Sequence, residues 1–238
     1  MQVVDFYFDF SSTNSYFAAF MLPETCRRHD AIVNWIPLHL GALFRETGFD
    51  VMAMTPRKAR YLWRDHQRYA ELTGLPFRRP RRFPIKTADA LRGVIAAAHL
   101  SGAKREAGAD AARVRARVDL TCEAVAKYSQ AVMRAYWERD ENIADRAVLG
   151  AIAGSVGLDR DAFTRLIDSE AVRDELKSIT GRAAERGVFG ARCFSSAPRC
   201  SGARTVSTSS NTGSPAPSTE SLTSRAEERS LRADGTAP

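Results

Sequence analysis

At 238 residues, the chain has room for one large domain or two small domains with a substantial core. Apolar residues make up 44% and charged residues 26% of the sequence, as in ordinary globular proteins. The net charge of +7 is spread along the chain as arginine beside glutamate or aspartate, so we interpret it mainly as solvated surface. The densest basic cluster, RRPRR at residues 78–82, has no interleaved aromatic residues, which argues against nucleic-acid binding.

The cysteines and histidines do not form a metal-binding pattern. No two cysteines have CxxC spacing and the four histidines are scattered, so we predict no metal site. The cysteines are Cys26, Cys122, Cys193 and Cys200. The start, MQVVDFYF, lacks the features of a signal peptide, and no apolar run approaches the roughly 18 residues of a membrane span. We therefore expect a cytoplasmic protein with reduced thiols and no membrane association.

The first forty residues predict a strand, a helix and a second strand. Apolar residues alternate over residues 3–10, and bulky side chains on both faces indicate a largely buried strand. Ser12 is a good N-cap for the helix that follows, in which Pro23 predicts a kink or break. The second strand spans residues 31–40 and ends at Gly41. Such a βαβ unit predicts two parallel strands joined by a right-handed crossover.

The sequence then predicts a long helical region. Pro56 begins the first helix of this region, and Gly74 and Pro76 end it. Turns that contain Gly or Asp separate the helices that follow. The predicted helices span residues 56–73, 86–100, 111–137, 145–156, 160–168 and 169–187.

The C-terminal segment has a different composition. Residues 192–238 are rich in Ser, Thr, Ala, Arg, Gly and Pro, and Phe194 is their single aromatic residue. This composition cannot bury enough apolar surface to offset the entropy of the chain. We therefore predict disorder, with no strand after residue 191.

The turn between the first strand and helix carries the polar sequence SSTNS at residues 11–15. Ser12 lies where backbone N–H groups lack helical partners and the helix dipole is positive, which stabilises an anion such as a thiolate. A CxxC motif would place an activated cysteine there, whereas Ser12-x-x-Ser15 offers a hydroxyl that can donate to the thiolate of a ligand. The alternative is that Ser12 only caps the helix.

Six further sequence motifs occur along the chain in this order: VDFYFDFSSTNSYFAA, PLHLGALFRETG, TPRKARYLWRD, LPFRRPRRFP, MRAYWERDENIAD and ERGVFGA. In this order they resemble the 2-hydroxychromene-2-carboxylate isomerases, which belong with the kappa-class glutathione transferases to the DsbA-like branch of the thioredoxin superfamily. The resemblance covers residues 3–191. It implies an α/β, thioredoxin-like fold with an all-helical insertion domain, and the divergent tail predicts that the C-terminal strands are missing.

The resemblance also implies roles for four residues. Ser12 matches the essential serine that contacts the sulfur of glutathione, and Arg45 matches a basic residue near the substrate carboxylate. Lys58 matches a lysine of the ligand site, and Val188 matches a residue whose backbone pairs with the glutathione peptide. The alternatives are that Arg45 is a solvated surface charge, that Lys58 is structural and that Val188 belongs to the core.

The sequence departs from the family pattern at three positions. Thr13 stands where the family commonly has Pro, Phe49 stands where relatives often have Asn, and Arg192 replaces a cis-proline. Codons can be chosen so that a neighbouring reading frame encodes a family-like ending from residue 191 onward. We therefore hypothesise that the tail is an out-of-frame translation product.

The function implied is glutathione-dependent isomerisation of 2-hydroxychromene-2-carboxylate to trans-o-hydroxybenzylidenepyruvate in the catabolism of aromatic hydrocarbons. The cofactor is glutathione, the partner is a small aromatic substrate, and the family implies a homodimer. Two alternatives are a kappa-like glutathione transferase and an inactive, truncated relic. The predicted domains are residues 1–48 and 171–191 for the thioredoxin-like part, 49–170 for the helical insertion, and 192–238 for the tail.

Overall fold

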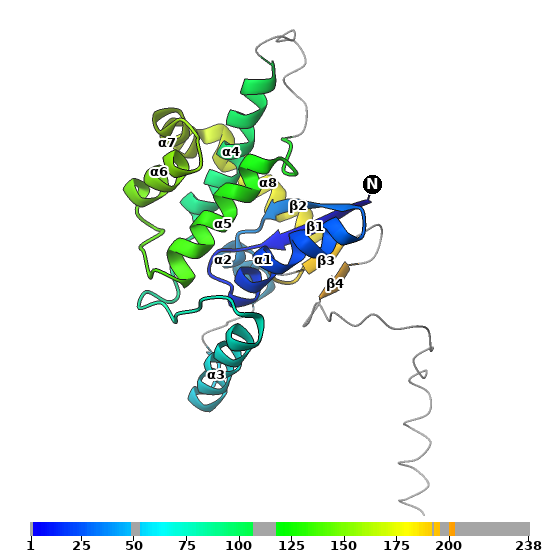
Figure 1. The fold of residues 1–238 in the computed structure, drawn as a ribbon, viewed down its shortest axis with the longest axis vertical. Helices are drawn as coiled ribbons and strands as arrows, with labels where there is room; N and C mark the ends of the chain where they lie inside the picture. Colours follow the sequence, from blue (N-terminus) through cyan, green and yellow to red (C-terminus); the bar gives the residue numbers. More distant parts are fainter. Residues whose placement is uncertain (1, 49–52, 107–117, 192, 196–199, 203–238) are drawn as a thin grey trace, which may run out of the picture. The chain divides into compact units, whose positions relative to one another are not determined.

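The computed structural model describes residues 2–48, 53–106, 118–191, 193–195 and 200–202. All of them lie in the first of the two units into which the chain divides, residues 1–206 (Figure 1). The elements in chain order are β1 (Gln2–Phe8), α1 (Thr13–Arg28), β2 (Ala31–Pro37), α2 (Leu40–Thr47), α3 (Pro56–Thr73), α4 (Ala88–Glu106), α5 (Glu123–Trp137), α6 (Arg146–Ser155), α7 (Arg160–Asp168), α8 (Glu170–Glu185), β3 (Cys193–Ser195) and β4 (Cys200–Gly202).

The sheet has the strand order β2-β1-β3-β4. β1 and β2 are parallel and in register from Gln2 opposite Ala31 to Phe8 opposite Pro37, which confirms the predicted βαβ unit. β3 pairs with β1 in the antiparallel direction, with Phe194 opposite Phe6. β1 is thus a central strand, and its C-terminal end is enclosed by neighbours on both sides.

The prediction that no strand follows residue 191 is wrong. β3 and β4 each have three residues, and Cys193 and Phe194 of β3 are only 1% and 9% exposed. The Phe194 ring stacks on Phe6 at 5.5 Å between centroids. The average composition of the tail did not indicate strand β3, because two adjacent apolar residues are enough to pair with the edge of β1. Arg192, residues 196–199 and residues 203–238 lie outside the described residues, so the predicted disorder of the tail is untested.

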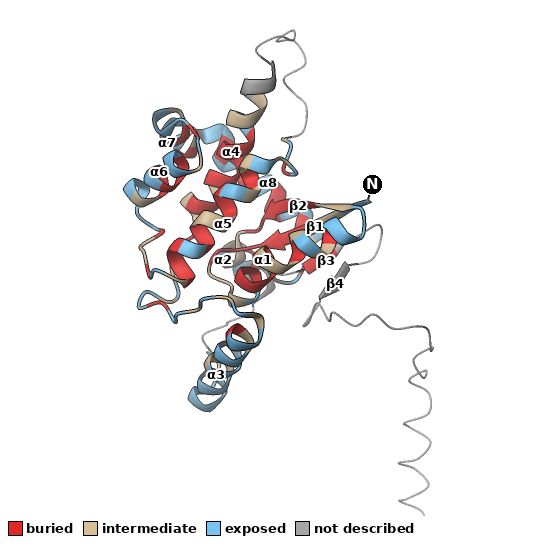
Figure 2. Cartoon of the chain, viewed as in Figure 1, coloured by how far each residue is buried: buried red, intermediate tan, exposed pale blue. Residues whose placement is uncertain are grey.

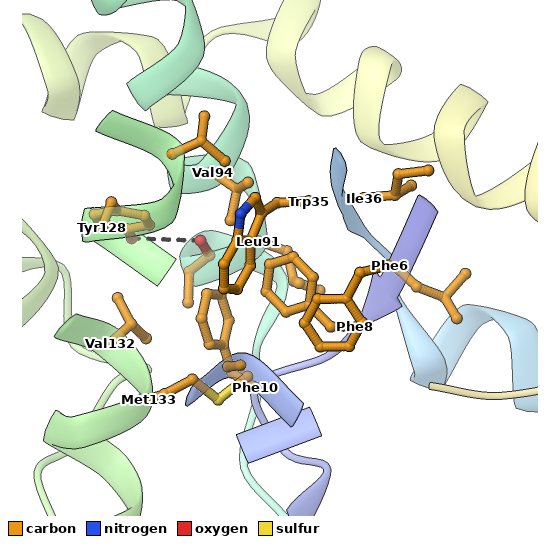
Figure 3. Close-up of a cluster of buried hydrophobic side chains, with 14 of the residues drawn as sticks. Phe6, Phe8, Phe10, Trp35, Ile36, Leu91, Val94, Tyr128, Val132 and Met133 are labelled. Carbon is orange, nitrogen blue, oxygen red and sulfur yellow. Dashed lines mark hydrogen bonds between the residues drawn. The ribbon is translucent and has the colours of Figure 1, made fainter. Parts of the chain in front are cut away.

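One face of the sheet carries the aromatic core. Phe6, Phe8 and Trp35 lie together with Leu91 of α4 and Met133 of α5 (Figure 3). The ring centroids of Phe6 and Phe8 are 5.5 and 5.8 Å from that of Trp35, with edge-on geometry. Helices predicted to form an insertion therefore complete the core of the sheet.

The opposite face of the sheet packs on α8. Arg186, at the end of α8, donates to the Tyr7 hydroxyl at 2.9 Å and pairs with Asp5 at 3.4 Å. Successive residues of β1 thus contact different layers, as the alternation of the strand requires. The predicted domain boundaries at residues 48, 170 and 191 remain a prediction.

Several predicted helices have the expected bounds. α3 spans Pro56–Thr73, with Thr55 as its N-cap and Gly74 in the left-handed conformation (φ +69°) at its C-terminal end. α7 spans the predicted residues 160–168. α1 continues through Pro23 to Arg28, so the helix does not end at the proline.

Two predictions about helices are wrong. α2, at Leu40–Thr47, was not predicted, because Ile36, Leu38 and Leu40 alternate and so favour a continuation of β2. The helix predicted from residue 111 begins only at Glu123 in the described part of the chain. There the Asp119 side chain accepts hydrogen bonds from the Thr121 N–H (3.0 Å) and hydroxyl (2.6 Å), which stabilises a turn instead of a helix.

The helices differ in how far they are buried (Figure 2). α4 and α5 have continuous buried faces, whereas Ala70 is the one buried residue of α3. α3 includes Tyr61 and Leu72, which are 60% and 82% exposed. Among the described residues, no helix combines the length and the apolar character needed to cross a membrane.

The stack of Phe194 on Phe6 tests whether β3 contributes to stability. We expect Phe194→Ala to lower the free energy of unfolding by about 3 kcal/mol, because the ring is buried against the central strand. Leu72→Ala removes an apolar side chain that is 82% exposed and should change stability by less than about 0.5 kcal/mol. Urea unfolding of the full chain measures both, and equal effects of the two substitutions would contradict the assignment of β3.

Candidate functional site

A cavity of about 1260 Å³ lies at the C-terminal end of β1. Its walls come from the N-terminus of α1, from α2 and α3, from the segment that leads into α4, and from residues 189–191 after α8. The lining is largely apolar. The polar and charged residues that line it are Asp9, Ser11, Ser12, Thr13, Asn14, His39, Arg45, His66, Arg79, Lys86 and Thr87.

Ser12 is both the N-cap of α1 and a lining residue of this cavity. Its backbone is extended (φ −91°, ψ 116°), and its Oγ accepts a hydrogen bond from the Ser15 N–H at 3.2 Å. A hydroxyl that accepts one hydrogen bond still has its own proton to donate. The prediction that Ser12 is an N-cap is therefore confirmed, and the cap is compatible with donation to an anion in the cavity, a role that stays a prediction.

Ser15 does not share this position. It is fully buried, it does not line the cavity, and its hydroxyl has no hydrogen-bond partner among the described residues. The two serines of the Ser12-x-x-Ser15 pattern are thus inequivalent, and only Ser12 can contact a ligand in the cavity.

Asp9 ties together three of the segments that form the cavity. Its carboxylate is 1% exposed, and it accepts hydrogen bonds from the Ser11 N–H (2.8 Å) and hydroxyl (2.7 Å). It also accepts from the Leu40 N–H at the start of α2 and from the Thr87 hydroxyl before α4, both at 3.1 Å. Asp9 was not predicted as a site residue, because a single acidic residue at the end of a strand gives no sign of hydrogen-bond donors in distant segments.

His39 lies at the junction of β2 and α2, and sequence analysis also missed it. Its backbone N–H donates to the Thr180 hydroxyl at 3.2 Å, and its side chain makes no capping hydrogen bond to α2. Burial is the main reason why the pKa of His39 is lowered from its ordinary value of 6.5. Asp9 opposes this shift of the pKa, and the cations Arg45 and Arg92 add to it.

Arg45 is exposed in the last turn of α2 and lines the cavity. It approaches His39 across Gly41. A β-carbon added at Gly41 would lie 3.7 Å from His39 Nε2 and 3.9 Å from Arg45 Nη1. The absence of a side chain at Gly41 therefore leaves the space between these two side chains open to the cavity.

Two of the predicted ligand contacts lie outside the cavity lining. Lys58 is exposed in the first turn of α3, where its N–H donates to the Thr55 hydroxyl at 3.4 Å. Val188 is 3% exposed, and its N–H donates to the Ala183 carbonyl at 3.0 Å, so this N–H is already used within the chain. The roles predicted for Lys58 and Val188 stay predictions, and Phe49 lies outside the described residues.

α3 contributes two aromatic side chains that the sequence did not single out. His66 Nε2 is 3.2 Å from the Thr13 hydroxyl. The guanidinium of Arg79 lies 4.8 Å from the centre of the Trp63 ring. Trp63 lies in the motif TPRKARYLWRD, His66 follows that motif directly, and Arg79 lies in the motif LPFRRPRRFP. These positions were the only local signal for the three residues.

The charges of the cavity favour an anionic ligand with an apolar body. Arg45, Arg79 and Lys86 line it, and Asp9, the one acidic residue of the lining that the structure describes, is buried and occupied by its four hydrogen bonds. Aromatic and aliphatic residues supply most of the remaining surface. Such a site suits a carboxylate that carries a planar or aliphatic group.

This fold and turn define a thioredoxin-like protein with serines in place of a redox cysteine pair. The DSBA-like thioredoxin domain matches residues 3–195, and the chain belongs to this family. Over 193 residues it is 26% identical to a 2-hydroxychromene-2-carboxylate isomerase from Sphingobium xenophagum, covering 80% of this chain and 86% of the relative. The resemblance predicted from the sequence motifs is thereby confirmed.

Solved structures confirm the predicted thioredoxin-like fold. A structure of 2-hydroxychromene-2-carboxylate isomerase superimposes with a TM-score of 0.64 at 23% identity, over 83% of this chain and 87% of that one. The cytosolic disulfide reductase DsbM from Pseudomonas aeruginosa, solved with GSH, gives a TM-score of 0.53 at 18% identity. That match covers 84% of this chain and 88% of DsbM.

The hydrogen bonds of Asp9 predict a large effect of its removal. Asp9→Ala leaves four donors without an acceptor, and we expect the free energy of unfolding to fall by about 3 kcal/mol. The control is Asp174→Ala, which removes an exposed ion pair with Lys177 and should cost less than about 1 kcal/mol. Urea unfolding measures both, and an Asp9→Ala variant as stable as the control would refute the anchoring role.

The lowered pKa of His39 predicts a loss of stability in mild acid. As the pH falls, the unfolded chain takes up the proton on His39 at a higher pH than the folded chain does. The contribution of neutral His39 to the free energy of unfolding is therefore complete above pH 6.5 and is lost as the pH falls through 6.5 toward the folded pKa. His39→Gln has no such titration. Urea unfolding at a series of pH values should therefore show wild type losing stability relative to His39→Gln below pH 6.5. Parallel curves for the two proteins would show that the pKa is not lowered.

Proposed function

We propose that this protein is a glutathione-dependent isomerase that converts 2-hydroxychromene-2-carboxylate to trans-o-hydroxybenzylidenepyruvate. The observation that carries the proposal is the Ser12 hydroxyl, which lies at the N-terminus of α1 and lines a cavity with apolar and cationic walls. The name of the relative supplies the substrate. The DsbM structure solved with GSH shows that a protein of similar fold binds this tripeptide.

The residues of the cavity fit glutathione by the chemistry of their donors. The Ser12 hydroxyl and the N–H groups of the first turn of α1 favour a thiolate at that end of the cavity. Arg79 and Lys86, in the segment before α4, offer cations for carboxylates. Bound glutathione supplies a thiolate that adds reversibly to a conjugated double bond, which permits rotation about that bond before the thiolate leaves.

The chain itself orients the reaction. Arg45 holds the substrate carboxylate, and the aromatic rings of the lining, including Trp63 and Phe83, pack against the ring of the substrate. The apolar walls exclude water, which strengthens the hydrogen bond from Ser12 to the thiolate. These groups hold the sulfur and the substrate together without taking part in covalent chemistry.

Glutathione binding tests this proposal directly. We expect calorimetry to show that Ser12→Ala weakens binding of glutathione by about 10- to 100-fold, since a hydrogen bond to a charged group is lost. Binding of S-methylglutathione, which has no thiol, should change much less. Ser169 caps α8 with a hydrogen bond from the Val172 N–H at 3.3 Å, so Ser169→Ala is a matched control for loss of a cap.

Turnover distinguishes the alternatives. An isomerase converts 2-hydroxychromene-2-carboxylate with glutathione below the substrate concentration and leaves total thiol unchanged, whereas a transferase consumes the thiol. Equal affinity of wild type and Ser12→Ala for glutathione would refute the role of Ser12. Glutathione binding without turnover of this substrate would refute the isomerase assignment.

A further inference from the structure

His39 and Arg45 both line the cavity, and the proposed function assigns no role to His39. Both side chains lie beside Gly41, where an added β-carbon would meet His39 Nε2 at 3.7 Å and Arg45 Nη1 at 3.9 Å. His39 lines the cavity, and its imidazole makes no capping hydrogen bond that would give it a purely structural task. The side chain is thus placed to act on a ligand bound by Arg45.

The substrate of the proposed function carries its hydroxyl and its carboxylate on the same carbon, C2 of the chromene ring. A carboxylate paired with Arg45 therefore brings the 2-hydroxyl into the immediate neighbourhood of that guanidinium. Ring opening must take a proton from this hydroxyl and supply a proton to the ring oxygen. A neutral imidazole is suited to both transfers at neutral pH.

We propose that His39 is the acid–base residue that opens the chromene ring of the substrate held by Arg45. This inference rests on the proposed function. His39 accepts the 2-hydroxyl proton, and the electron pair of that O–H bond forms the carbonyl at C2. The bond between C2 and the ring oxygen breaks, and its electron pair goes to that oxygen. The imidazolium then returns the proton to the phenolate, so atoms and charge balance without a further reactant.

The charges around His39 are consistent with a base that is neutral before reaction. Arg45 of α2 and Arg92 of α4 disfavour the imidazolium, and Asp9 at the end of β1 favours it. The Asp9 carboxylate is held by donors from Ser11, Leu40 and Thr87. α8 presents the Thr180 hydroxyl, which accepts from the His39 N–H. The imidazole is thus able to take up a proton from the substrate and release it again.

Kinetics of the full chain with 2-hydroxychromene-2-carboxylate and glutathione test the proposal. We expect His39→Gln to lower kcat by about 10²- to 10⁴-fold with KM changed much less. In wild type, kcat should fall at acidic pH because the base becomes protonated, and His39→Gln should not show this fall. Its affinity for glutathione, measured by calorimetry, should equal that of wild type. Imidazole added to His39→Ala should restore part of the activity, which a merely structural role would not predict.

Gly41→Ala provides a second variant that keeps His39. The new methyl group meets His39 Nε2 and Arg45 Nη1 at ordinary contact distances, 3.7 and 3.9 Å, and alanine favours the helix, so the protein should fold with equal or higher Tm. The methyl occupies the space where the 2-hydroxyl would lie, so we expect kcat/KM to fall by at least about tenfold. Gly181→Ala in α8, where the added carbon would lie within 4 Å of no described side chain beyond its chain neighbours, is the control.

The outcomes separate this inference from the proposed function. A wild-type chain that binds glutathione but does not convert the substrate overturns both. A wild-type chain that converts it, together with a His39→Gln variant of unchanged kcat and unchanged pH profile, overturns the role of His39 alone. A third outcome is that His39→Gln lowers kcat, imidazole does not restore activity to His39→Ala, and the fall of kcat at acidic pH persists in His39→Gln. That outcome would show that His39 has only a structural role.

Discussion

The buried carboxylate of Asp9 is the contact on which the candidate site depends. A carboxylate that is 1% exposed is stable only when hydrogen bonds replace its lost hydration, and here the donors come from three separate segments. Ser11 precedes the N-cap of α1, Leu40 begins α2, and Thr87 precedes α4. A buried Asp9 carboxylate without these donors would cost free energy. Its hydrogen bonds therefore hold the α1 turn, α2 and the segment before α4 at the same end of β1.

The anchored turn places Ser12 where two demands coincide. A helix needs an acceptor at its N-cap, and an anion is stabilised by the same unpaired N–H groups. The Ser12 hydroxyl serves the first demand by accepting from Ser15 and keeps its proton for the second. A single small residue can therefore cap α1 and face a ligand, which explains why the capping interpretation does not exclude the functional one.

The sequence predicted the parts of this structure that depend on local pattern. The alternation in β1, the capping signals of α3 and the βαβ order needed no tertiary information. β3 was missed because Phe194 stabilises it through a contact with Phe6, almost two hundred residues earlier in the chain. Asp9, His39 and His66 were missed for a similar reason, since the groups that act on them lie in distant segments. Asp9 accepts a hydrogen bond from Thr87, the charges of Asp9 and Arg92 act on the pKa of His39, and His66 contacts Thr13.

The position of the thiols bears on the chemistry of the site. Among the described residues, Cys26 and Cys193 are buried, and no cysteine lines the cavity. Burial raises the pKa of the Cys26 thiol, so this group is a poor nucleophile near neutral pH. Ser15, at the second position of the redox motif, has no thiol for disulfide exchange, and its buried hydroxyl has no hydrogen-bond partner in the part of the chain that the structure describes. A helix N-terminus that opens into a cavity whose described lining contains no cysteine is consistent with the proposal that the thiol arrives with the ligand.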